Sequence, residues 1–191
     1  MDRSTHQELW AYLESLRLGE ILTGRVAAIE RFGVFVALDE GPAHPLFPGV
    51  GFITVPELSW HRIEAVEEVV EVGQSVACEF LQFDDWNLEA RLSLRALRPD
   101  PLKEFADRTP VGTRLQGRVT KLLPFGAFVR VADGIEGLVH LTELAWTPVD
   151  DPVDNPEDIV RVDDEITVVV TEIDLERRRL ALSLRQATPP G

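Results

Sequence analysis

The sequence predicts an all-β protein: two tandem five-stranded barrels with a short N-terminal helix and a helical linker. Three observations support this prediction. The chain contains an internal repeat, each repeat holds short runs of Val, Ile, Leu, Phe and Thr separated by turn residues, and 191 residues suffice for two small cores. We expect the helix at 1–17, the barrels at 18–98 and 110–187, the linker at 99–109 and a tail at 188–191.

Four sequence blocks of the first half recur in the same order in the second half. The paired blocks are Gly24-Arg25-Val26 with Gly117-Arg118-Val119, Phe32-Gly33-Val34-Phe35-Val36 with Phe125-Gly126-Ala127-Phe128-Val129, Glu57-Leu58-Ser59-Trp60 with Glu143-Leu144-Ala145-Trp146, and Leu92-Ser93-Leu94-Arg95 with Leu182-Ser183-Leu184-Arg185. The repeats differ in two connections: an insert at 39–50 in the first, and a longer segment at 146–160 in the second. Both are rich in Pro or Gly, which is typical of surface loops.

The apolar runs of the second repeat predict five strands. They span residues 113–122, 127–131, 137–141, 166–173 and 180–184, with a tight turn at Asp133-Gly134. Because one small repeat holds all five strands, a closed barrel is the expected architecture.

Two short segments outside the strands have helical patterns. Ser4-Thr5-His6-Gln7 has the pattern of a capping box, and Leu9, Leu13 and Leu16 follow it at helical spacing. Between the repeats, Asp100-Pro101 combines a preferred N-cap residue with a preferred first helical residue.

Composition and charge exclude several classes of protein. Cys78 is the only cysteine, which excludes an internal disulfide and a zinc site of several thiolates, and we expect its side chain in the core. The polar N-terminal segment lacks the features of a secretory signal, and no apolar run is long enough to span a membrane, so we expect a cytoplasmic protein with no membrane partner. The formal net charge of -14 repels phosphate at long range, so nucleic-acid binding requires local groups.

The second repeat carries a family signature. Its segments are Gly117-Arg118-Val119, residues 125–129, residues 136–144 and residues 173–184. Together they resemble the S1-type RNA-binding domain, an OB-fold barrel, and residues 100–187 are most similar to the inner repeats of bacterial small-subunit ribosomal protein S1. The resemblance implies non-catalytic binding of single-stranded RNA, a link to translation or RNA metabolism, and the ribosome or an RNA-processing protein as a further partner.

The aromatic pair of the second repeat is the first candidate for RNA contact. Single-stranded RNA is bound by exposed aromatic rings flanked by cationic groups. Phe125 and Phe128 are three residues apart, so a regular strand would place them on opposite faces, but a bulge or a loop-to-strand transition at Gly126 would bring both rings to one surface. The alternative is that both rings belong to the core.

The resemblance implies RNA contacts at His140 and Arg179, and a supporting or base-contacting role for Asp174. Arg179 ends the densest positive cluster of the chain, and a guanidinium both pairs with phosphate and stacks on a base. A buried ring for His140 and solvated arginines are the alternatives. Lys121, in the first strand beside the aromatic pair, is a further candidate for phosphate contact.

The first repeat keeps Phe32 and Phe35, which we include as candidate RNA contacts. It has Thr54 and Glu89 at the positions of His140 and Arg179, and is the more acidic repeat, so we expect a weaker auxiliary site or a protein-docking module.

The tryptophans divide into two kinds. Trp60 and Trp146 share a motif position, and we interpret both as structural plugs. Trp86 lies in a predicted turn, where we expect at least partial exposure; contact with RNA or a partner and local packing are the alternatives for its ring.

No enzyme motif is present in the sequence. The acidic residues of 150–158 do not have calcium-loop spacing, and the four histidines are not grouped at ligand spacing. We therefore expect no catalytic residue, no metal site and no cofactor. The alternative to RNA binding is an acidic interaction module that docks on a basic or ribosomal partner, with vestigial RNA contact.

Overall fold

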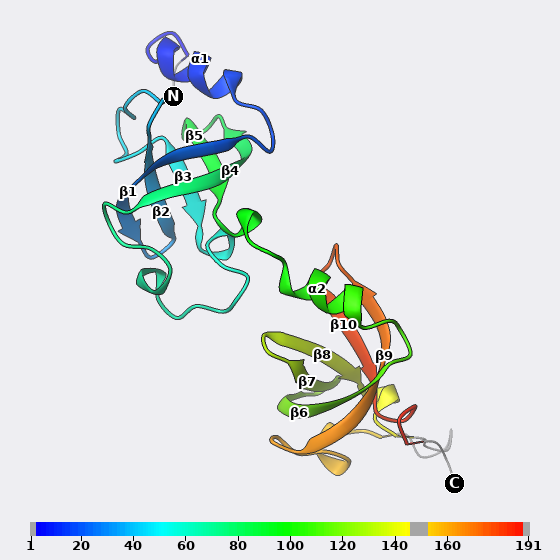
Figure 1. The fold of residues 1–191 in the computed structure, drawn as a ribbon. Helices are drawn as coiled ribbons and strands as arrows, with labels where there is room; N and C mark the ends of the chain where they lie inside the picture. Colours follow the sequence, from blue (N-terminus) through cyan, green and yellow to red (C-terminus); the bar gives the residue numbers. More distant parts are fainter. Residues whose placement is uncertain (1–2, 146–152, 189–191) are drawn as a thin grey trace. The chain divides into compact units, whose positions relative to one another are not determined.

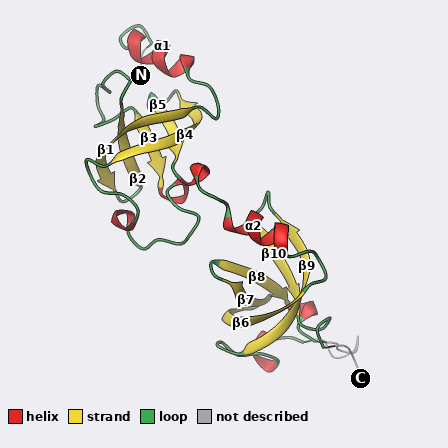
Figure 2. Ribbon diagram, in the orientation of Figure 1, coloured by secondary structure: helices red, strands yellow, loops and turns green. Residues whose placement is uncertain are grey.

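The computed structural model describes residues 3–145 and 153–188 and divides into two compact units, Met1–Asp100 and Pro101–Gly191 (Figure 1). Each unit contains one closed barrel of five strands. Figure 2 shows that strands make up most of the regular structure and that the helices are short. The predicted fold class, two five-stranded barrels with a short N-terminal helix, is confirmed.

The two barrels have the same strand order. The strands are β1 (Ile21–Glu30), β2 (Gly33–Leu38), β3 (Gly51–Thr54), β4 (Ser75–Asp84) and β5 (Glu89–Ser93) in the first, and β6 (Arg114–Leu123), β7 (Gly126–Ala132), β8 (Ile135–His140), β9 (Glu165–Asp174) and β10 (Arg179–Ser183) in the second. Strands β3 and β5, and likewise β8 and β10, pair in parallel, whereas the other pairs are antiparallel. All five strands expected in the second repeat are present, with ends shifted by one or two residues.

Short 3-10 helices occupy several connections: η1 (Val55–Glu57), η2 (Val66–Glu68), η3 (Arg95–Leu97), η4 (Leu141–Glu143) and η5 (Pro156–Asp158). The predicted turn at Asp133-Gly134 joins β7 to β8, and Gly134 adopts a φ of 68°, in the left-handed region that glycine tolerates.

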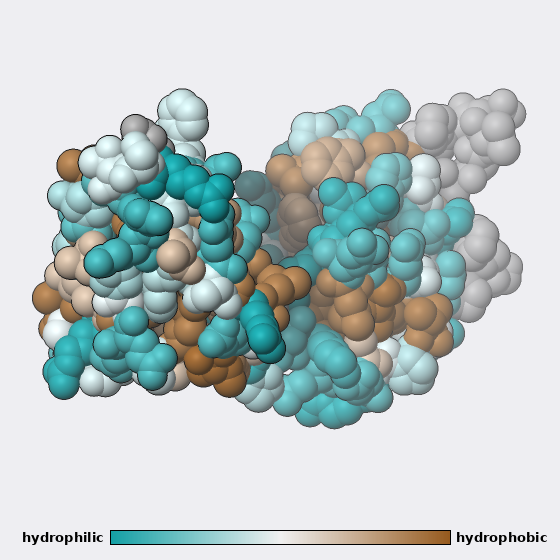
Figure 3. Space-filling view, turned by 90° about the horizontal axis from the view of Figure 1, so that it is seen from above, coloured by the Kyte–Doolittle hydropathy of each residue, from teal (hydrophilic) through white to brown (hydrophobic). Residues whose placement is uncertain are grey.

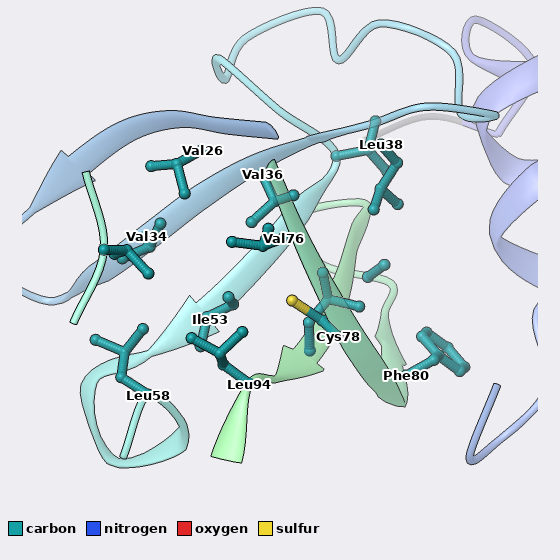
Figure 4. Close-up of a cluster of buried hydrophobic side chains, with 14 of the residues drawn as sticks. Val26, Val34, Val36, Leu38, Ile53, Leu58, Val76, Cys78, Phe80 and Leu94 are labelled. Atoms are coloured by element: carbon teal, nitrogen blue, oxygen red, sulfur yellow. The ribbon is translucent and has the colours of Figure 1, made fainter. Parts of the chain in front are cut away.

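Each barrel encloses its own apolar core. In the first, β-branched side chains from neighbouring strands meet around Cys78 (Figure 4). Burial raises the pKa of the Cys78 thiol to about 12, so this cysteine stays protonated and unreactive in the folded protein. The prediction that Cys78 is a core residue is confirmed.

The repeated Gly-Arg-Val block marks a close approach of strands. A Cβ at Gly24 would meet the carbonyl oxygen of Ala37, and one at Gly117 would lie 2.5 Å from Cγ1 of Val129. Glycine at these positions lets the first strand of each barrel cross its neighbour, which explains why the block occurs in both repeats.

The N-terminal helix begins later than the capping-box pattern predicts. Helix α1 spans Gln7–Ser15 with His6 at its N-cap and no side-chain cap hydrogen bond, so the predicted capping box is wrong. Leu9 and Leu13 are buried in the core of the first barrel, as their helical spacing predicts. Packing of this apolar face, rather than a cap, therefore stabilises the helix.

Helix α2 spans Pro101–Arg108 and begins at the predicted residue. Leu102 and Phe105 are buried in the core of the second barrel, so the helix is part of the second unit. Neither α-helix in the described part of the chain has the length and apolar character needed to cross a membrane.

Candidate functional site

A row of directly paired residues crosses the outer face of the second barrel. The row runs over four pairings, β6 to β7 to β8 to β10 to β9, through Lys121, Phe128, Leu138, Ala181 and Glu172. Residues directly opposite in neighbouring strands project from the same face. The middle of the row is apolar and partly buried, and its two ends are exposed charges.

A hollow of about 680 Å³ lies over this row. Its walls include five of the eight candidate RNA contacts: Phe125, Phe128, His140, Asp174 and Arg179. Phe125 and Phe128 come from the start of β7 and the turn before it, His140 and Asp174 end β8 and β9, and Arg179 begins β10, so the barrel topology brings them together.

The two phenylalanines reach this hollow because of the backbone at Gly126. Phe125 is in the turn before β7, and Gly126 is the first residue of that strand, opposite His140. A Cβ at Gly126 would collide with the carbonyl oxygen of Val139, so only glycine fits this approach. The ring of Phe125 is 49% exposed and that of Phe128 partly buried, so the interpretation of both rings as core residues is wrong.

His140 is exposed at the end of β8. Its Nδ1 accepts a hydrogen bond from the backbone N–H of Thr142 at 3.3 Å and lies 3.0 Å from the hydroxyl of that residue. The neutral ring therefore carries its proton on Nε2, which makes this nitrogen a donor. The alternative of a buried histidine does not hold.

Asp174 lies directly opposite Arg179 in the ladder of β9 and β10. Its Oδ1 instead accepts the backbone N–H of Arg177 at 2.9 Å, and its Oδ2 is 4.0 Å from Nε of the same residue. In the part of the chain that the structure describes, no carboxylate is within ion-pair distance of Arg179, which is exposed. Asp174 thus orders the turn, and the guanidinium of Arg179 is open to a ligand.

The wall of the hollow also contains residues that the sequence analysis did not single out. Leu138 and Glu172 lie in the wall of the hollow, two residues before His140 and Asp174 respectively. Residues two apart in a strand lie on the same face, so the positions of His140 and Asp174 could have indicated Leu138 and Glu172. Lys121 is exposed opposite Phe128, at the edge of the row and outside the wall of the hollow.

The equivalent face of the first barrel carries a smaller hollow, of about 410 Å³, and Phe47 of the insert is part of its wall. Its row of paired residues is Ala28, Phe35, Phe52, Arg91 and Gln82. The ring of Phe35 is only 5% exposed and stacks on Phe47 of the insert, with ring centroids 5.4 Å apart. Phe35 therefore stays a predicted RNA contact, and in this structure the insert covers its ring. Phe32 is 62% exposed at the edge of the face.

Arg91 lies in the middle of this face, at the position of Ala181 in the second barrel. Its guanidinium lies 4.8 Å from the ring centroid of Phe52 and forms ion pairs with Asp84 at 2.6 Å and with Glu89 at 3.3 Å. Glu89 is buried, and burial raises the pKa of its carboxyl group despite the nearby arginine. The cationic group of this face is thus engaged within the barrel.

Comparison with known proteins decides the family. The sequence model described as "S1 RNA binding domain" matches residues 15–95 and 108–185, once in each barrel. The chain belongs to the S1 RNA-binding domain family. Its two S1 domains are similar to the small ribosomal subunit protein bS1 of Mycobacterium tuberculosis, at 46% identity over 177 residues. The corresponding protein of Neisseria meningitidis is 36% identical over 187 residues.

These alignments cover 92% and 97% of the chain but 34% and 31% of the two relatives, so the chain spans about a third of their length. Among solved structures, GSP13 from Bacillus subtilis is 34% identical over 42% of this chain and 60% of that chain, with a TM-score of 0.36. The resemblance to S1-type domains that the sequence motifs indicate is confirmed.

The tryptophans of the S1 domains differ in their surroundings. In the first domain, Trp60 donates a hydrogen bond from Nε1 to the carbonyl oxygen of Arg98 at 3.2 Å and lies under Arg95, which supports the plug interpretation. Its counterpart Trp146 lies outside the described residues. Trp86 is 83% exposed, as expected for its turn. In the view of Figure 3, apolar and hydrophilic residues lie side by side on the surface.

The acidic segment 150–158 is described only in part, since residues 150–152 are outside the described ranges. Within residues 3–145 and 153–188, no group of three His, Cys, Asp or Glu side chains is placed to hold a metal ion.

Proposed function

We propose that the chain is a non-catalytic single-stranded RNA-binding protein linked to translation, and that its second S1 domain holds the RNA. One observation carries this proposal: the exposed ring of Phe125, the partly buried ring of Phe128 and the open guanidinium of Arg179 line one hollow. Bases stacked on aromatic side chains contribute roughly 1–3 kcal/mol each, so two rings and a cation suffice for a short segment of RNA.

Each residue around the hollow has a role that follows from its contacts. Phe125 and Phe128 stack on bases, and Arg179 binds phosphate or lies over a base. His140 donates from Nε2, because Nδ1 is already an acceptor. Lys121, at the far end of the row, binds phosphate.

The partners follow from the relatives. Both are named as small ribosomal subunit proteins, which supports the ribosome, in the cytoplasm, as the place where this chain meets RNA. The names of these relatives describe ribosomal proteins and refer to no reaction.

The test is a titration of labelled unstructured RNA and of duplex RNA at fixed salt. Phe128→Ala and Arg179→Ala should each weaken binding of the unstructured RNA at least about fivefold. Val111→Ala, which shortens an exposed apolar side chain of the second domain outside the hollow, is the control and should leave the affinity unchanged. Unchanged affinity in the folded Phe128→Ala variant would refute the site.

A further inference from the structure

The insert of the first S1 domain, residues 39–50, contacts the outer face of its own barrel. The equivalent face of the second domain is the one that carries the proposed RNA site. The Phe47 ring of the insert stacks on Phe35 at an interplanar angle of 23°. The equivalent ring in the second domain, Phe128, has no aromatic neighbour among the residues described. In that domain a tight turn at Asp133-Gly134 stands in the place of the insert, and Phe128 is only partly buried.

A buried histidine fixes the insert in this position. Nε2 of His44 donates to the carbonyl oxygen of Asn87, 2.8 Å away in the turn between β4 and β5. Its Nδ1 accepts the backbone N–H groups of Leu46 and Phe47 at 3.0 and 2.9 Å. The imidazole also stacks on the ring of Phe47, with centroids 4.7 Å apart. One side chain thus ties the insert to the barrel and orients the covering ring.

The groups around Phe35 have the chemistry of a single-stranded RNA platform. Phe35 contacts Phe52 with centroids 5.0 Å apart, and Arg91 lies over the ring of Phe52. Phe32, exposed at the edge, is 6.3 Å from Phe35 in an edge-to-face arrangement. Aromatic rings with an adjoining guanidinium are the chemistry that holds unpaired bases.

We propose that Phe47 occupies the place of a stacked base on Phe35, so that the first S1 domain contains a second single-stranded RNA site that its own insert partly covers. The proposal rests on the proposed function, in which the same face of the second domain stacks bases. The intact chain then has one open site and one partly covered site, and displacing the insert adds RNA contacts along the same protein.

The test is made in the full chain carrying Phe125→Ala and Phe128→Ala, which silences the open site. Adding Phe47→Ala should increase the affinity for a labelled short oligouridylate by about fivefold or more, since one stacking position is released. Leu46→Ala is the matched control, because Leu46 is an exposed apolar residue of the same insert and does not stack on Phe35. A further Phe35→Ala change should remove the gain.

Thermal unfolding of each variant shows whether the first domain is intact. Where Phe47→Ala does not fold, His44→Gln releases the insert while keeping the ring, and should give a gain in the same direction. A folded Phe47→Ala variant without a gain over its background overturns the proposal. The wild-type titration run in parallel tests the open site separately, because its loss on Phe125→Ala and Phe128→Ala concerns the second domain alone.

Discussion

The carboxylate of Asp174 and the backbone N–H of Arg177 are joined by a 2.9 Å hydrogen bond across the turn between β9 and β10. Arg178, within that turn, adopts the left-handed backbone conformation with a φ of 54°. Asp side chains commonly bond to the backbone in this way at turns. The position of Arg179 in the hollow therefore depends on an acidic residue that orders the backbone before it.

Removing this turn contact should weaken RNA binding. Asp174→Ala removes the acceptor, and we expect a loss of about two- to tenfold, the usual worth of one hydrogen bond. Asp174→Asn keeps an oxygen at the same place and should retain most of the affinity. RNA titrations of both variants check this. An equal loss in the two variants would show that the charge, not the turn, is required.

Binding should depend only weakly on salt. The cations around the hollow are Arg177, Arg178 and Arg179 in its wall and Lys121 at its edge. With about 0.7 counterions released per phosphate contact on single strands, four contacts predict a slope of log affinity against log salt no steeper than about -3. Titrations over a series of salt concentrations measure this slope, and Arg179→Ala should reduce it by about 0.7. A steeper slope would mean that RNA contacts other surfaces.

The strands were predictable because they depend on local pattern, whereas the resemblance to S1-type domains implied the roles of His140 and Arg179. Side-chain alternation alone would place Phe125 and Phe128 on opposite faces of a strand. The repeat fails at Phe35, which it equates with Phe128. A contact from Phe47, in an insert present in only one repeat, decides the burial of Phe35. No local pattern contains that contact.

The roles of charged side chains were less predictable than the positions of rings. The ladder does place Asp174 opposite Arg179, yet its carboxylate binds a backbone N–H three residues away. Likewise, the sequence does not show that Arg91 fills the first barrel's face, because its ion pairs and its contact with Phe52 depend on three different strands or turns.

Gly126→Ala should destabilise the second S1 domain. The added methyl group would collide with the carbonyl oxygen of Val139, a backbone atom that cannot move without disturbing β8. Overpacking of this kind costs typically about 1–3 kcal/mol in the free energy of unfolding. Amide hydrogen exchange at β7 and β8 in the intact chain measures the loss of protection.

Gly112→Ala is the control for this prediction. A Cβ at Gly112 meets nothing within 4 Å, although the residue has a φ of +94°. It therefore reports the conformational cost alone, in the absence of a clash. A Gly126→Ala effect no larger than that of the control would contradict the close approach as its cause.

Acid should destabilise the first S1 domain through His44. Burial lowers the pKa of this imidazole below its usual 6.5, and the nearby His6 acts in the same direction, against the hydrogen bond to Asn87. Because the folded domain holds the neutral ring, the unfolded chain binds the proton more readily, and the free energy of unfolding falls as the pH falls below about 6.5, until the folded-state pKa is reached. Protonation of Nδ1 also removes the acceptor that holds Leu46 and Phe47.

Denaturant unfolding of the intact chain at neutral and mildly acidic pH measures this effect, with the fluorescence of Trp10, which packs against Phe83 in the first barrel, among its signals. His44→Gln should lower the stability at neutral pH and flatten the pH dependence in this window, because the titrating group is gone. Two results would contradict this role of neutral His44. The wild type would gain stability on acidification, or its pH dependence would persist unchanged in His44→Gln. Protonation of the His44 imidazole would therefore make the position of the insert over Phe35 depend on pH.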